Sequence, residues 1–221
     1  MYGVFRWASM SVNPVFAFRS TVLVCVFILG FAPILEPGPP QTNEGFKMDR
    51  ASGYLIDDFS NDRGVSSHGT RWKMFTDRVM GGRSTAVSGY DTIQERRCLR
   101  LRGSVSLENR GGFIQVALPL KRGIRLFDAG GYAGVRLTVL GNGERYQVHL
   151  RTSSTVLPWQ YYWASFTAGP DWETIDIPFD RFEPENLGKA LNPAKLKRIA
   201  IVAIKKEFQA EVAVARLEFF R

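Results

Sequence analysis

The sequence predicts an all-β protein built from two packed antiparallel sheets. Runs of helix-favouring residues are scarce, whereas the 221 residues include 21 Gly and 16 Phe, a composition that favours strands and tight turns. Short segments of alternating polar and apolar residues follow one another with turn residues between them, which is typical of a sandwich or barrel. With 45% hydrophobic residues, the chain is long enough to bury one substantial core.

Ahead of this domain, residues 1–35 predict a signal peptide or a membrane anchor. No acidic residue precedes Glu36, and residues 21–35 carry no charge. That apolar run is closer in length to the core of a signal peptide than to the roughly 20 residues of a spanning helix. Its cleavage site is poor, so an uncleaved anchor stays open. Basic residues before the run favour an exported, periplasmic or membrane-associated domain, and a mitochondrial presequence is the alternative.

Residues 36–53 are rich in Pro and polar residues and predict a linker, so the folded domain is expected over residues 54–221. The segments 135–139 and 145–151 alternate cleanly on either side of Gly141-Asn142-Gly143, and we expect them to pair as a β-hairpin. All the expected strands lie near Leu55, Thr85, Leu99 and Phe113, and over 135–139, 145–151, 160–167, 172–177, 198–204 and 211–220.

Two of the later segments carry more specific signals. The run 199–204 is apolar on both faces, which predicts a central, fully buried strand. Residues 192–197 predict a helical turn, with Asn192 as the N-cap and Pro193 at the first helical position. The strands together suffice for two packed antiparallel sheets.

The segment WKMFTDRVMGGRS, from Trp72 to Ser84, is the most idiosyncratic in the chain. Its adjacent glycines permit positive φ angles or a close approach to another surface. The Asp77 carboxylate and the Ser84 hydroxyl can accept hydrogen bonds from nearby backbone N–H groups, and we expect Val79 and Met80 to pack inward. This predicts a turn that holds two strands in register, and contact with a partner is a compatible second interpretation. The residues assigned to this partner-binding loop are Trp72, Asp77, Arg78, Met80, Gly81, Gly82 and Ser84.

The same segment resembles the NADH:ubiquinone oxidoreductase (complex I) intermediate-associated protein 30 family, whose members carry a D-x-V-M-G-G-x-S block preceded by Trp. The resemblance covers about Leu55 to Phe219. It implies a jelly-roll, galactose-binding-domain-like sandwich that chaperones complex I intermediates. One departure is Glu185, which stands where the family often has Arg after F-x-P. The other matching motifs begin at Asp57 (D-D-F), Gly103 (G-x-x-S), Asn109 (N-x-G-G-F), Gly141 (G-x-G-x-x-Y), Leu150 (L-R-T) and Trp172 (W-x-x-x-x-I-P-F).

The net charge of +8 favours anionic partners, whether lipid, nucleic acid or acidic protein. Arg97, Arg100 and Arg102 alternate with apolar residues, as the solvent side of a strand would. No motif of a nucleic-acid-binding fold is present. We therefore interpret these cations as a solvated strand face and expect no nucleic-acid partner.

Catalytic residues are not expected. The chain has two His, and we expect His68 in a polar loop and His149 on the polar face of a strand, so no cluster follows that could hold a metal. The two Cys form neither a disulfide within the domain nor a metal site. Asp57 and Asp58 would point to opposite faces of a strand, and a structural calcium there would lack an Asp-rich loop. The sequence predicts no enzyme, cofactor or metal.

A ligand-binding face is the better prediction. In the expected hairpin, Arg136, His149 and Arg151 share one face, and the next strand adds Trp159 and Tyr161. Arginine donors and flat rings suit carbohydrate hydroxyls as well as protein partners, although a strand must bury one alternate set of its aromatics. The first hypothesis is therefore a non-enzymatic assembly factor that binds a protein, and the second is a carbohydrate- or envelope-ligand-binding module in the periplasm.

Overall fold

The computed structural model describes residues 53–61 and 63–221. The predicted signal or anchor and all of the predicted linker except Gly53 lie outside these residues, so their boundaries stay predictions. Every described residue belongs to one compact unit. Within the described part of the chain, no helix is long and apolar enough to span a membrane.

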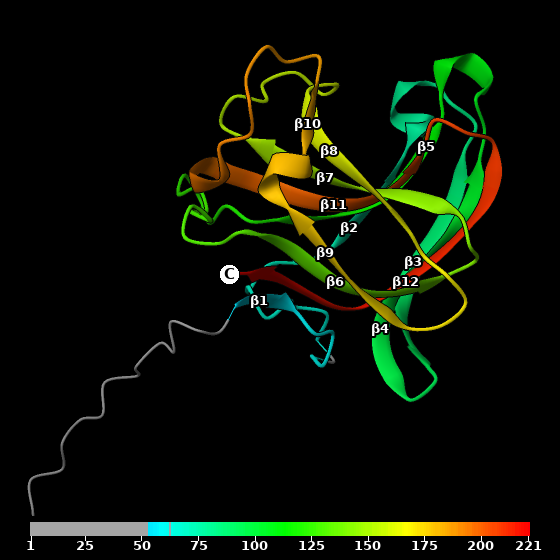
Figure 1. Ribbon diagram of the computed structural model, residues 1–221. Coiled ribbons are helices and arrows are strands. Elements are labelled where there is room, and N and C mark those ends of the chain that lie inside the picture. The colour runs from blue at the N-terminus through cyan, green and yellow to red at the C-terminus, as the bar shows by residue number, and fades with distance from the viewer. Residues whose placement is uncertain (1–52, 62) are drawn as a thin grey trace, which may run out of the picture. The chain divides into compact units, whose positions relative to one another are not determined.

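The described residues form two six-stranded antiparallel sheets that pack face to face (Figure 1). This arrangement confirms the predicted all-β sandwich. The strand order of the first sheet is β3-β4-β12-β6-β9, with β1 added alongside β12. Its strands are β1 (Tyr54–Asp57), β3 (Thr85–Ile93), β4 (Arg96–Val105), β6 (Gly134–Gly141), β9 (Glu173–Pro178) and β12 (Phe208–Phe220).

The second sheet has the order β10-β8-β7-β11-β5-β2. Four short 3₁₀ turns connect strands among the described residues: η1 (Asp77–Met80), η2 (Glu108–Arg110), η3 (Phe179–Arg181) and η4 (Pro193–Lys195). The strands of the second sheet are β2 (Lys73–Thr76), β5 (Phe113–Pro119), β7 (Arg145–Thr152), β8 (Tyr161–Thr167), β10 (Glu183–Glu185) and β11 (Leu196–Ile204).

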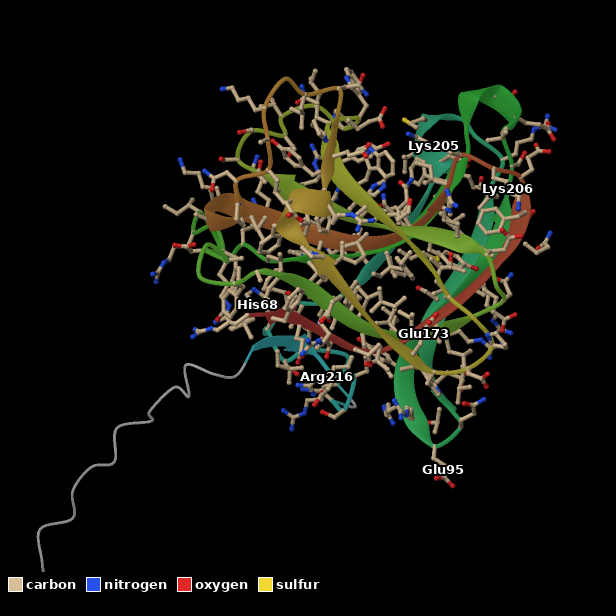
Figure 2. All side chains as sticks on the ribbon, in the orientation of Figure 1. His68, Glu95, Glu173, Lys205, Lys206 and Arg216 are labelled. Carbon is tan, nitrogen blue, oxygen red and sulfur yellow. The ribbon has the colours of Figure 1, made fainter. Side chains whose placement is uncertain are left out.

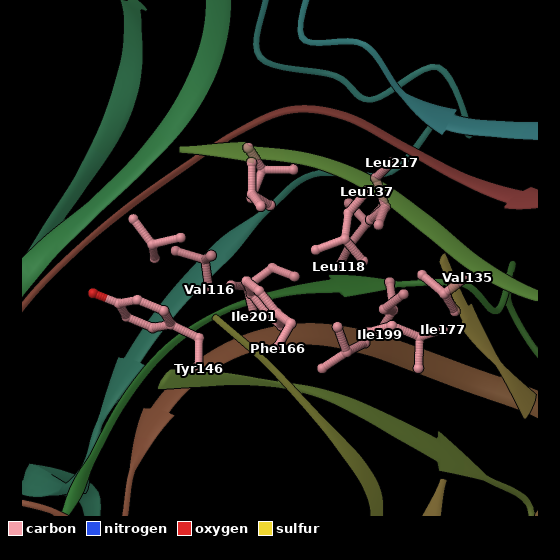
Figure 3. Packing of buried hydrophobic residues seen from close by; sticks show 14 of the residues in the cluster. Val116, Leu118, Val135, Leu137, Tyr146, Phe166, Ile177, Ile199, Ile201 and Leu217 are labelled. Atoms are coloured by element: carbon pink, nitrogen blue, oxygen red, sulfur yellow. The ribbon is translucent and has the colours of Figure 1, made fainter. Parts of the chain in front are cut away.

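The core lies between the two sheets, where apolar side chains of both inner faces interdigitate (Figure 3). Strand β11 runs between β7 and β5, and its Ile199 and Ile201 are fully buried in this core. Because side chains alternate along a strand, Ala200 and Val202 point to the other side of the sheet, where they form a second, smaller apolar cluster. The predicted central strand, buried on both faces, is confirmed.

The predicted β-hairpin is wrong. Strand β6 pairs with β12 and β9, whereas β7 pairs with β11 and β8, so the turn at Gly141–Gly143 leads from one sheet to the other. Tyr146 is fully buried just after this turn, and its hydroxyl hydrogen-bonds the carbonyl of Glu211 on β12 (3.0 Å). The alternation of polar and apolar residues shows which face of a strand is buried. It does not show whether the next strand along the chain lies in the same sheet or in the opposite one.

Of the shorter elements, the sequence predicted the one with a strong local signal and missed two without one. The helical turn is confirmed as η4, and the Asn192 side chain caps it by accepting a hydrogen bond from the Ala194 N–H (3.0 Å). The sequence did not predict β2 or β10, which have four and three residues. Segments of that length carry too few residues for a period to be read.

Candidate functional site

Asp77 organises the loop that joins β2 to β3. Its side chain is fully buried, and its Oδ1 accepts a hydrogen bond from the Ser84 N–H (2.9 Å) while Oδ2 accepts bonds from the Ser84 hydroxyl and from the Gly112 N–H (2.6 Å). Burial acts to raise the pKa of Asp77, but these donors hold it below its usual value. The ionised carboxylate therefore joins two loops that are distant in sequence.

The glycines around Asp77 leave room for its carboxylate. A Cβ built on Gly82 would lie 2.3 Å from the Asp77 Cγ, and one on Gly111 would lie 2.4 Å from its Oδ2. Gly81 instead ends η1 with a φ of 87°, a conformation that favours glycine. The D-x-V-M-G-G-x-S and N-x-G-G-F motifs are thus two halves of one structural unit.

The expectation that Val79 and Met80 pack inward is wrong. Their residues are 72% and 58% exposed, because Asp77 takes the inward position at the start of the η1 turn. Arg78 is also exposed, whereas Ser84 is buried. Of the predicted partner-binding loop, Arg78, Met80 and Gly81 are therefore available to a partner. The buried carboxylate of Asp77 and hydroxyl of Ser84 position them.

Trp72, the remaining member of that loop, is half-buried and faces the domain. Its indole Nε1 donates a hydrogen bond to the Asp57 Oδ2 (2.7 Å), and its ring lies 6.0 Å from that of Phe59. The Asp57 Oδ1 accepts bonds from the backbone N–H groups of Phe59 (3.0 Å) and Ser67 (3.4 Å). Protein donors thus occupy the Asp57 carboxylate, and in the described residues no group of three or more His, Cys, Asp or Glu is placed to hold a metal ion.

A groove of about 870 Å³ crosses the outer face of the second sheet. Ala200, Val202 and Ile204 of β11 line it, and aromatic rings from β2, β5 and β8 and the β7–β8 loop flank this strand. The exposed Val79 and Met80 of η1 form part of one end. The loop ordered by Asp77 therefore contributes directly to a concave, mostly apolar surface.

The groove brings together four of the five residues predicted to form a ligand face: His149, Arg151, Trp159 and Tyr161. Their ligand-binding role stays a prediction. Arg136 does not belong with them, because it lies on β6 in the first sheet. There its guanidinium Nε is 2.6 Å from the Asp176 Oδ1. The error follows directly from the wrongly predicted hairpin.

His149 is a neutral, stacked ring on the groove wall and not a surface histidine. It is 7% exposed, stacks on Tyr161 with ring centroids 4.1 Å apart, and its Nε2 lies 2.8 Å from the Gln147 Oε1, to which it donates. Burial, followed by the positive charges of Lys205 and Arg198, lowers the pKa of His149 to about 3. The site therefore holds an uncharged imidazole at neutral pH.

His68 lies in a loop, as expected, but it is 2% exposed and is therefore not a surface histidine either. Its Nε2 donates to the Leu120 carbonyl (2.8 Å), and its Nδ1 accepts a hydrogen bond from the Tyr54 hydroxyl (2.8 Å). Burial, the largest cause, lowers the pKa of His68. This histidine ties β1 to the end of β5 and lies outside the groove.

Two arginines lie side by side in the groove. Arg151 of β7 and Arg198 of β11 are register partners. Arg151 donates to the carbonyls of Thr155 (3.3 Å) and Leu157 (2.7 Å) and so supports the loop that carries Trp159. The guanidinium of Arg198 lies over the Phe75 ring, with its Cζ 5.9 Å from the ring centroid. It makes no hydrogen bond or ion pair with any described residue.

Arg198 was missed in the sequence because it stands at the start of an apolar run. The available signal was its spacing of two from Ala200 and four from Val202, which places all three on one face of the strand. Burial, and after it the nearby Arg151, lowers the pKa of Arg198. No described residue that lines the groove is acidic. The groove can therefore accommodate an apolar ligand, an aromatic-stacking ligand or an anion.

Comparisons with known proteins agree with this architecture. A sequence model of the family described as Complex I intermediate-associated protein 30 (CIA30) matches residues 58–213. No curated protein sequence matches the chain.

Several solved structures share the fold. The family 11 carbohydrate-binding module of a cellulosomal cellulase of Clostridium thermocellum has a TM-score of 0.60 at 13% identity, with 77% of this chain and 95% of that chain covered. The family 11 module from Clostridium thermocellum in complex with a beta-1,3-1,4-mixed-linked tetrasaccharide has a TM-score of 0.58 at 13% identity, with 76% of this chain and 94% of that chain covered. A family 30 carbohydrate-binding module has a TM-score of 0.50 at 14% identity, with 67% of this chain and 82% of that chain covered. The TM-scores show a common β-sandwich fold, and at identities this low the likeness is one of fold alone.

Proposed function

Because the chain belongs to the Complex I intermediate-associated protein 30 family, we propose that it is a non-enzymatic assembly factor whose groove binds a protein partner while complex I is assembled. The family match supports complex I as the client, and the groove supports the binding of a partner on the outer face of the second sheet. We further propose that residues 1–35 bring the domain to a membrane, either as an export signal or anchor or, alternatively, as a mitochondrial presequence.

The end of the groove at η1 supports a protein partner. Val79, Met80 and Leu107 are 72%, 58% and 46% exposed and gather at the same end of the groove. Water-exposed large apolar side chains beside a concave apolar surface mark interaction sites. Methionine adapts to partners of different shapes because its side chain is unbranched and polarisable. An intermediate exposes apolar segments that can pack against such a surface.

Affinity capture of the full-length chain from detergent-solubilised membranes of its source organism tests this proposal. We expect complex I subunits to be recovered with the wild-type chain and with Val87→Ser, and to be lost with Met80→Ser. Val87 is the matched control because it is 60% exposed but lies on β3 of the first sheet. Repeated captures without complex I subunits would reject the client, and equal recovery by both variants would reject the groove as its site.

A carbohydrate ligand is the second proposal, and the aromatic rings of the groove favour it. Trp159 is 55% exposed beside Tyr161, and flat exposed rings stack on sugar faces. The mixed-linked tetrasaccharide bound by the family 11 module is a suitable probe. Calorimetric binding of this tetrasaccharide that is lost in a folded Trp159→Ala variant would support a glycan, and absence of binding to the wild-type chain would count against this choice of sugar.

A further inference from the structure

We propose that the groove binds an extended polypeptide segment that carries a carboxylate side chain, and that Arg198 is the residue that holds the carboxylate. This inference rests on the proposed function, since it specifies the chemistry of the partner segment. An apolar side chain of the same segment packs at the opposite end of the groove, against Met80.

One end of the groove concentrates positive charge that no protein anion compensates. Arg151 and Arg198 are register partners, and Lys197 is close enough for Arg151 and Lys121, after burial, to lower its pKa. Within the described residues, no acidic side chain forms an ion pair with any of these four cations. Like charges that are partly removed from water repel one another, so an anion bound there is favoured.

Among the described cations that line the groove, Arg198 is the one whose donors are free, since Lys205 pairs with Glu185 (2.9 Å). Arg151 uses its guanidinium on the carbonyls of Thr155 and Leu157, and the Lys197 Nζ lies 3.4 Å from the Thr155 carbonyl. Among the described residues, the half-buried Arg198 side chain has only the contact with the Phe75 ring, whose centroid lies 5.9 Å from its Cζ. This contact is not a hydrogen bond, so the N–H donors of Arg198 stay available, and their fork matches the two oxygens of a carboxylate.

The middle and the far end of the groove suit a peptide. From Arg198 to Ile204, β11 spans about 20 Å, which is the length of about six residues of extended chain. Gln115 of β5 is the register partner of Val202, and among the described residues its side-chain amide has no hydrogen-bond partner. A free amide can donate to and accept from a peptide backbone. Beyond it lie the apolar Ile204 and Met80.

A selection experiment tests this chemistry. Displayed random octapeptides are selected on the immobilised full-length chain. We expect enrichment of Asp or Glu at a fixed spacing from a large apolar residue. A selected peptide should lose about 10-fold in affinity when its acid is replaced by the amide, or when the protein carries Arg198→Gln, because a hydrogen-bonded charge pair is removed. Salt should weaken the wild-type complex.

Arg216→Gln is the matched control. Arg216 is an exposed arginine on β12 of the first sheet, paired with Glu218 (2.7 Å), and Figure 2 shows it on the opposite side of the molecule from Lys205, which lines the groove. This variant should bind the selected peptides with unchanged affinity. Arg198→Lys, which keeps the charge but loses the fork, should bind with intermediate affinity, and thermal unfolding should show that every variant is folded.

Enrichment of neutral or basic peptides, absence of enrichment, or equal affinity for Arg198→Gln would each overturn the inference. Binding of the mixed-linked tetrasaccharide without any acidic peptide would overturn it in favour of a glycan. If Arg198→Gln still captures complex I subunits in high salt, the inference fails and the proposed function stands. If acidic peptides are selected but complex I subunits are never captured, the proposed client fails and the inference stands.

Discussion

The carboxylate of Asp77 accepts a hydrogen bond from the backbone N–H of Gly112, 35 positions later in the chain, over 2.6 Å. This bond joins the β2–β3 loop to the segment between η2 and β5. Both segments contribute to one end of the groove. A buried charge therefore sets the shape of a surface that it does not itself reach.

Replacing Asp77 with Asn should destabilise the domain. The amide keeps the size of the side chain but loses the charge that strengthens its hydrogen bonds, and its NH₂ group faces N–H donors. We expect a loss of about 2–4 kcal/mol in the free energy of unfolding, measured by urea denaturation. Asp171→Asn is the control, because Asp171 is exposed, and it should change stability by no more than about 0.5 kcal/mol. Equal stabilities would contradict a structural role for Asp77.

Gly111→Ala should also destabilise the domain, for a steric reason. The φ of Gly111 is −75°, which any residue can adopt, so the cost comes from the approach of its Cβ, mainly to the Asp77 Oδ2 (2.4 Å) and less to the Glu108 carbonyl oxygen (3.0 Å). We expect a cost of about 1–3 kcal/mol. At Gly89 a Cβ would meet nothing within 4 Å, so Gly89→Ala should be neutral or slightly stabilising. The same cost at both glycines would show that the carboxylate is not the cause.

His149 should make stability depend on pH. Its pKa is lowered from 6.5 to about 3 in the folded chain, by burial first, so the unfolded chain binds the proton more readily. The neutral imidazole therefore contributes stability that is fully present above about pH 6.5 and is lost as the pH falls towards 3. Urea midpoints at about pH 7 and about pH 5 should differ by more in the wild-type chain than in His149→Gln. Identical differences would indicate that the ring is protonated in the folded state.

Local sequence patterns predicted the faces of the strands but not all of their neighbours. The central strand, with its run 199–204 that is apolar on both faces, and the helical turn capped by Asn192 could be predicted because their signals lie within a few residues. The separation of β6 from β7 could not, because the alternation is the same in either sheet, and this error placed Arg136 on the wrong face. The groove residues of β7 and β8 were found by their period of two, whereas Arg198 was hidden by the apolar residues that follow it.

Experiments should show different roles for the two register-paired arginines of the groove: Arg151 should support the loop, and Arg198 should contact the ligand. Arg151→Gln removes the donors to the Thr155 and Leu157 carbonyls, so amide hydrogen exchange over residues 153–160 should accelerate by about 10-fold, as expected for the loss of about 1.4 kcal/mol of local stability. Arg198→Gln should leave that exchange unchanged, because Arg198 makes no hydrogen bond to any described residue of the loop, and should weaken only the binding of acidic peptides. Hydrogen exchange followed by mass spectrometry of peptic fragments measures the first effect. Faster exchange in the Arg198 variant as well would show that both guanidinium groups serve the loop, and the carboxylate contact would then need another cation.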